Sequence, residues 1–245
     1  MPRANRYYLP NHIWHITHRC HKQEFLLKFS RDRKRWLHWL FEAKKRYGIC
    51  VLNYIVTSNH IHLLVVDTKP NCISKSMQLI AGRTAQEYNQ RKKRKGAFWE
   101  DRYFATAIDS DTHLTKCLTY IDLNMVRAGV VKHPLDWKES GYNEIQQPAH
   151  RYRIIDRNKL LTLLDLKTDE SLKQYHKKWI DEALLKNNCE RDAIWSQSLA
   201  VGSKEFTEKF QKELASKASG RGCIQLGDMY YIKESSIAYI NTFNG

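Results

Sequence analysis

The sequence predicts an α+β fold, because strand-like and helix-like patterns follow one another in a definite order over residues 12–108. Alternating or continuous apolar runs predict strands at 12–19, 49–57, 60–67 and 97–108. Apolar residues at helical spacing predict helices at 30–47 and 73–90. The order strand, helix, strand, strand, helix, strand is that of the ferredoxin-like split βαβ arrangement, in which two helices cover one face of an antiparallel sheet.

The helix boundaries follow from capping and breaking residues. Ser30 or Asp32 can cap the first helix, and Gly48 ends it. The second helix follows Pro70 and stops before the basic run at 91–95, which is too charged to pack and predicts an exposed loop. A third helix is expected from 112 to 128, between possible N-cap residues at 109–111 and a glycine at 129.

The charge balance favours a polyanionic partner. The 245 residues include 41 Lys and Arg against 26 Asp and Glu, a formal net charge of +15, and nucleic acid is the first candidate partner. The six cysteines show no Cys-x-x-Cys spacing, so neither a zinc knuckle nor a disulfide framework is expected. No apolar run approaches the about 20 residues of a spanning helix, and no signal-peptide core follows Met1. We therefore expect a cytoplasmic protein with no membrane partner.

Two histidines on the strand at 60–67 are candidate metal ligands. Side chains at i and i+2 of a strand share a face, so His60 and His62 project together, about 6–7 Å apart at Cα. Ile61 and its neighbours at 63 and 65 fit the helix-covered face, which leaves the histidines on the open face. Such a pair can bind a divalent cation and leave its other positions open, or be polar residues on a half-exposed strand. His15 can reach the same face.

Tyr120 and Asn124 lie four residues apart and share a face of the predicted third helix. A phenol beside a metal-binding pair can attack a phosphodiester, giving a covalent 5′-phosphotyrosine and a free 3′-OH. Because tyrosine ionises near pH 10, the phenol needs a metal or a base. The alternative for a lone helical tyrosine is core packing, and only the combination with the histidines favours chemistry.

Two basic segments are expected to contact single-stranded DNA. The run Arg91, Lys92, Lys93, Arg94 and Lys95 precedes Phe98 and Trp99, and basic residues beside aromatic ones are typical of single-strand binding. A solvated loop is the alternative. Residues 1–10 carry Arg3 and Arg6 with two tyrosines, and are expected either to lie along a phosphate backbone or to be a frayed terminus.

An ordered set of motifs resembles the HUH single-tyrosine transposases, and among them the REP-associated tyrosine transposases. The set consists of residues 1–3, Trp14–Arg19, Thr57–His60 with Ile61-His62, Phe98–Tyr103, Tyr120–Gly129 and Trp137–Tyr142. The resemblance implies an HUH fold over residues 1–145 that cleaves and rejoins single-stranded DNA near palindromic hairpins. It makes His60 and His62 the ligands of Mg²⁺ or Mn²⁺ and Tyr120 the nucleophile, with Asn124 where the wider family often has a metal-binding Gln.

Three arginines of these motifs, Arg19, Arg102 and Arg127, complete the expected DNA-binding set. The chain departs from the family pattern at Asp122 and Met125, which leaves the DNA contacts of the third helix open. Residues 146–245 lie outside the resemblance and are expected to form a mainly helical accessory region, with helices at 158–165, 169–187, 189–200 and 203–217.

The implied partners are single-stranded REP-like hairpins, bound by a monomer or homodimer associated with the nucleoid. Two other functions stay open. One is a replication-initiator or relaxase-like HUH nickase, although relaxases generally place the tyrosine before the histidine pair. The other is a DNA-binding module that has lost catalysis.

Overall fold

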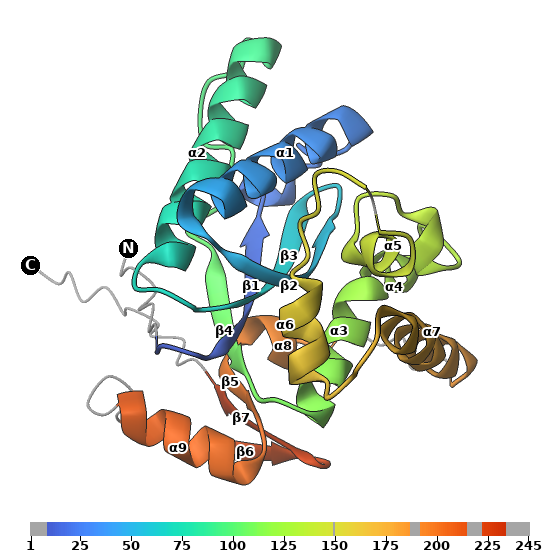
Figure 1. The fold of residues 1–245 in the computed structure, drawn as a ribbon. Helices are drawn as coiled ribbons and strands as arrows, with labels where there is room; N and C mark the ends of the chain where they lie inside the picture. The colour runs from blue at the N-terminus through green and yellow to red at the C-terminus, as the bar shows by residue number, and fades with distance from the viewer. Residues whose placement is uncertain (1–8, 149, 187–191, 215–221, 234–245) are drawn as a thin grey trace, which may run out of the picture.

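The computed structural model describes residues 9–148, 150–186, 192–214 and 222–233 (Figure 1). In these ranges one sheet of seven strands has the order β2-β3-β1-β4-β5-β7-β6. The strands are β1 Ile13–Arg19, β2 Cys50–Val56, β3 His60–Val66, β4 Phe104–Ile108, β5 Ser198–Gly202, β6 Cys223–Leu226 and β7 Met229–Lys233. All neighbouring strands pair antiparallel except β4 and β5, which are parallel.

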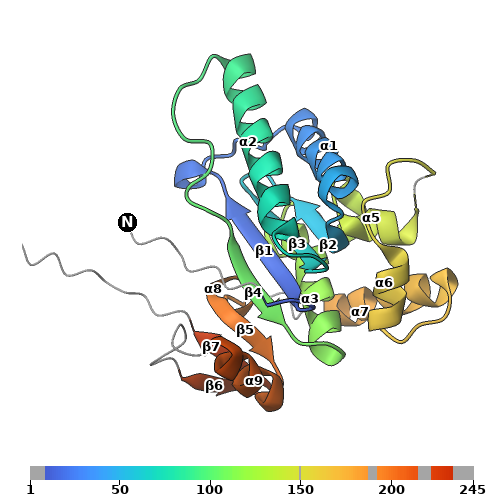
Figure 2. The same cartoon turned by 60° about the vertical axis from the view of Figure 1, so that its left-hand side comes forward.

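The first four strands and two helices form the predicted split βαβ unit. The helices α1 (Ser30–Tyr47) and α2 (Cys72–Lys92) pack side by side against one face of the sheet (Figures 1 and 2). Gly48 ends α1 with a left-handed φ of 71°, as the sequence predicts. The N-cap differs from the prediction, because Phe29 occupies it and no side chain caps the helix.

The opposite face of the sheet, predicted to be open, is covered around the histidines. There α3 (Thr112–Asp122) and the short α8 (Ile194–Gln197) pack over β1, β2 and β4. The expected single helix at 112–128 is interrupted at Leu123, whose ψ of 3° separates α3 from α4 (Asn124–Arg127). Gly129 follows with a positive φ of 67°.

The elements after residue 133 complete the fold. They include η2 (Pro134–Asp136), α5 (Gly141–Gln146), α6 (Arg157–Leu163), α7 (Asp169–Leu185) and α9 (Lys204–Leu214). Trp195, Val201 and Phe210 belong to the same buried hydrophobic cluster as Trp14 and Leu63. The C-terminal elements therefore extend the sheet and share its core, and the domain boundary at 145/146 stays a prediction.

Two element predictions are wrong. The helix expected at 189–200 is replaced, within the described residues, by α8 and by β5, because Ala200 and Val201 pair in register with Ala107 and Ile108 of β4. The strand expected from 97 begins only at Phe104. None of the helices in the described ranges combines the length and the apolarity that crossing a bilayer requires.

Candidate active site

The register of the sheet places His15, His60 and His62 on one face. Thr17 of β1 pairs with His62 of β3, and His15 lies two residues before Thr17. The partner strand β2 brings Asn53 to the same face, where it contacts α3. The side chains that the sequence placed together are therefore together, on the side of the sheet opposite α1 and α2.

Hydrogen bonds fix the tautomer of His62. Burial lowers the pKa of His15 to about 4, so its ring is neutral near pH 7. His15 Nδ1 donates to the carbonyl oxygen of Trp195 at 2.6 Å, which leaves Nε2 as the acceptor of that ring. His62 Nδ1 lies 2.8 Å from His15 Nε2 and therefore carries the proton that it donates. His62 Nε2 is then the unprotonated nitrogen, the form in which imidazole binds a metal.

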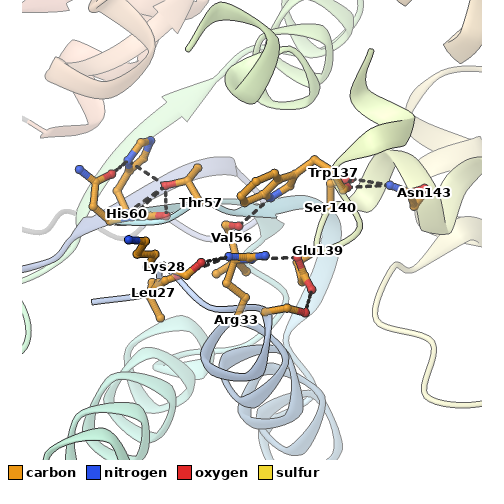
Figure 3. A network of polar contacts seen from close by, with 12 residues as sticks. Leu27, Lys28, Arg33, Val56, Thr57, His60, Trp137, Glu139, Ser140 and Asn143 are labelled. Atoms are coloured by element: carbon orange, nitrogen blue, oxygen red, sulfur yellow. Dashed lines mark hydrogen bonds and ion pairs between the residues drawn. The ribbon is translucent and has the colours of Figure 1, made fainter. Parts of the chain in front are cut away.

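His60 is held by the turn before β3. Its Nδ1 lies 2.7 Å from the amide oxygen of Asn59, which can only accept, so Nδ1 carries a proton. Thr57 Oγ1 lies 3.0 Å from the same nitrogen and accepts from the backbone N–H of His60 (Figure 3). The rings of His60 and His62 are 5.0 Å apart at 81°. In both imidazoles Nδ1 is thus engaged in a hydrogen bond, which leaves Nε2 as the nitrogen available to a metal.

Tyr120 is turned toward the histidines. Its ring is only 8% exposed and lies edge-on to His62, with centroids 5.8 Å apart and planes at 85°. His15 contacts it in the same way at 6.0 Å. The guanidinium of Arg127 lies 4.1 Å from the ring centroid and donates to the carbonyl oxygen of Tyr120. The phenol is therefore packed between the imidazoles and a cation.

Asn124 also reaches the histidine pair. Its amide Nδ2 lies 2.9 Å from His62 Nε2 and donates to it. Turning the amide by 180° would bring the oxygen to this point, since the two ends of an amide group have nearly the same shape. The interruption at Leu123 leaves both Tyr120 and Asn124 facing the same cleft.

The side chains of His60, His62 and Asn124 suit a divalent cation with some coordination positions left free of protein ligands. Within the described residues, no group of three or more His, Cys, Asp or Glu side chains could hold a metal ion. Two imidazole nitrogens and one amide oxygen can still supply part of a coordination shell, with the remaining positions left for water or substrate oxygen. The residues present therefore fit such an ion as an open site.

A cleft of about 1140 Å³ surrounds these side chains. Three of the predicted DNA-binding residues line it: Arg19, Arg102 and Arg127. The C-terminal region contributes Tyr231 and Lys233 from β7, together with residues 193–194 and 196–198 around α8. Nothing in the sequence linked Tyr231 or Lys233 to this site, because only the pairing of β5 and β7 with the sheet brings them here.

Residues 91–95, the basic run predicted to form an exposed loop, are only partly a loop and lie outside the cleft. Arg91 and Lys92 are the last residues of α2 rather than part of a loop, and Arg91 pairs with the buried carboxylate of Asp32. Lys93 and Lys95 are exposed, whereas Arg94 donates to the carbonyl oxygen of Ala97. None of these residues lines the cleft described above. Arg3 and Arg6 lie outside the described residues.

The aromatic residues expected beside that run face inward. Phe98 is 2% exposed, and the ring nitrogen of Trp99 donates to the carbonyl oxygen of Ala81. Trp99 also stacks on His18, with centroids 4.0 Å apart. Phe98, which the sequence placed beside the basic run, is therefore buried, and Trp99 is half-buried.

Asp122, at which the chain differs from the family pattern, is hydrogen-bonded to a residue of α7. Asp122 is 1% exposed and accepts from Asn53 at 3.0 Å and from His176 of α7 at 2.7 Å. His176 Nδ1 in turn accepts from Gln146 at 3.0 Å, which makes Nε2 the donor to Asp122. The carboxylate therefore ties α3, the helix of Tyr120, to β2 and α7.

On this split βαβ sheet, two histidines face a helix-borne tyrosine. Residues 8–124 match the model of a transposase family described as IS200-like. The REP-associated tyrosine transposase solved with a REP hairpin has the same fold, with a TM-score of 0.50 and 19% identity over 64% of this chain and 94% of that one.

A second solved structure is similar over a smaller part of the chain. This crystal structure of a transposase-like protein from Deinococcus radiodurans R1 has a TM-score of 0.34 and 15% identity, covering 44% of this chain and 87% of that one. No curated protein sequence matches the chain.

Proposed function

We propose that this protein cleaves and rejoins single-stranded DNA at or near REP-type palindromic hairpins, through a covalent 5′-phosphotyrosine on Tyr120. The observation that carries the proposal is the edge-on approach of the Tyr120 ring to His62, 5.8 Å between centroids, inside a cleft that also holds His60 and Asn124.

His60, His62 and Asn124 would hold the divalent cation, either Mg²⁺ or Mn²⁺. When bound, the ion polarises a phosphodiester oxygen and favours nucleophilic attack on phosphorus. Imidazole nitrogens without any carboxylate ligand make Mn²⁺ as suitable as Mg²⁺. The amide of Asn124 would supply its oxygen as a ligand after the 180° rotation of the amide group.

Tyr120 supplies the nucleophile. Its Oη forms a bond to phosphorus while the bond from phosphorus to the 3′ oxygen breaks, and the proton lost by the phenol is balanced by the proton gained at the 3′ oxygen. Arg127, 4.1 Å from the ring centroid, stabilises negative charge on the attacked phosphate. Reversal with another 3′-OH rejoins the strand. All these residues come from one chain.

The DNA partner is inferred from the positive charge of the protein and from the solved structure of similar fold. Arg19 and Arg102 line the cleft and can bind phosphates, and the net charge of +15 favours DNA throughout. The protein of similar fold was solved with a REP hairpin. In the proposed complex, the single-stranded part of the hairpin substrate would enter the cleft.

The test is covalent capture on a single-stranded hairpin oligonucleotide with Mn²⁺. The full-length protein should give a protein–DNA band that survives denaturing electrophoresis, and Tyr120→Phe should abolish the band without abolishing binding. Tyr231→Phe, which removes another phenol of the cleft, is the matched control and should retain the band. A band that persists in Tyr120→Phe would refute the proposal, and binding with no band in the wild type would favour the non-catalytic module.

A further inference from the structure

The loop between η1 (His21–Gln23) and α1 exposes two phenylalanines on a fixed backbone. Phe25 and Phe29 are 65% and 58% exposed, although Leu26 and Leu27 between them are buried at 7% and 0%. The two leucines anchor the loop in the core. The aromatic rings therefore face outward because the backbone holds them there.

Hydrogen bonds to the β2–β3 turn and to Arg33 hold that backbone. The N–H of Leu27 donates to the carbonyl oxygen of Ser58 in the β2–β3 turn at 2.9 Å. Arg33 donates to the carbonyl oxygens of Leu27 and Lys28 at 3.2 and 2.6 Å, and is itself paired with Glu139 at 2.8 Å (Figure 3). Rings presented by a fixed loop lose little conformational entropy when a flat ligand stacks on them.

Two lysines lie beside the ring of Phe29. The ammonium groups of Lys28 and Lys92 lie 6.0 and 5.7 Å from the centroid of Phe29. Of the carboxylates in the neighbouring segments, Glu24 is paired with Arg94 and Asp32 with Arg91. The sequence led us to expect aromatic rings beside basic residues around Phe98. In the structure, an exposed aromatic ring lies beside lysines at Phe29 and the end of α2.

The loop starts at the cleft. Gln23 lines the cleft, and its carbonyl oxygen accepts from the side chain of Asn59, the neighbour of His60. Phe25 follows two residues later. A strand leaving the cleft past Gln23 therefore meets Phe25 and Phe29 next, with lysines placed for its phosphates.

We propose that Phe25 and Phe29 form a base-stacking platform for the single-stranded DNA that flanks the cleaved phosphate. The inference rests on the proposed function and adds a binding subsite to it. Phenyl rings stack on any base, and the lysines bind the backbone, so the platform would hold the flank with little sequence preference. The positive surroundings favour DNA over an apolar protein surface as the occupant.

The test compares two hairpin oligonucleotides bound by the full-length protein. One carries a normal single-stranded flank, and the other carries an abasic flank that keeps the phosphates but has nothing to stack. The wild type should bind the normal flank more tightly, by about tenfold for each stacked base. The double variant Phe25→Leu/Phe29→Leu should lose that preference while its affinity for the abasic flank stays unchanged. Thermal melting verifies its fold.

The matched control is Tyr175→Leu, which removes an aromatic ring that is 47% exposed on α7, a helix that contributes nothing to the cleft. It should keep the wild-type preference. The platform is refuted if the double variant still prefers the normal flank, or if it loses affinity for both flanks equally. Covalent capture is measured in parallel: a Tyr120-dependent band in a double variant that keeps the preference would refute the platform and leave the proposed function standing.

Discussion

Replacing His15 by leucine should weaken metal binding although His15 is not one of the proposed ligands. The ring of His15 accepts the proton of His62 Nδ1 at 2.8 Å, and both residues are buried, at 0% and 4% exposure. Leucine leaves that N–H without its acceptor and allows His62 to adopt the tautomer in which Nε2 is protonated. A protonated Nε2 cannot bind the ion.

The size of the effect follows from these contacts. Loss of a group that orients a metal-binding histidine typically costs about 10–100-fold in metal affinity. The same substitution leaves two buried groups unpaired, His62 Nδ1–H and the carbonyl oxygen of Trp195, at about 1–3 kcal/mol of folding free energy each. The variant should therefore be both less stable and in need of more metal.

Glutamine at the same position separates the two effects. The amide oxygen of His15→Gln can accept from His62 Nδ1–H, so this variant should need nearly the wild-type concentration of Mn²⁺. The measurement is the Mn²⁺ concentration that gives half-maximal covalent adduct, which should rise about 10–100-fold in His15→Leu. His12→Leu, which removes a half-buried imidazole just before β1, is the control and should change nothing. Equal shifts in the leucine and glutamine variants, or none in either, would refute the orienting role of His15.

Three further substitutions test the packing around the site by chemical denaturation. Asp122→Ala removes the acceptor of both Asn53 and His176 and should lower the free energy of unfolding by about 2–6 kcal/mol; a loss under about 1 kcal/mol would contradict the buried network. Gly141→Ala places a Cβ 2.0 Å from the Asn53 amide oxygen and should cost about 1–3 kcal/mol. Gly82→Ala, inside α2 with nothing within 4 Å, should instead stabilise by about 1 kcal/mol, and effects of the same sign at both glycines would count against the structure.

The sequence predicted the half of the site that local periodicity controls. Alternation along a strand places His60 and His62 on one face whatever the tertiary context, and His15 reaches that face by the same rule. Helical spacing likewise associates Tyr120 with Asn124, and the interruption at Leu123 does not separate them from the cleft.

Long-range contacts decide the rest, and local patterns could not show them. Residues 198–202 form a strand because β4 offers an unpaired edge, not because their sequence is strongly strand-like. Phe98 is buried, whereas Phe25 is exposed because the two leucines after it occupy the core instead. Similarly, the buried carboxylate of Asp122 is accommodated by two partners distant in sequence, Asn53 of β2 and His176 of α7.

The central claim concerns which tyrosine attacks the DNA, and peptide mapping of the adduct tests it most directly. After nuclease treatment, trypsin should release residues 117–127, a peptide in which Tyr120 is the single tyrosine. Mass spectrometry should find the residual nucleotide on that peptide. An adduct on the peptide that contains Tyr231, or no adduct on any tyrosine under conditions in which the hairpin is bound, would contradict the claim.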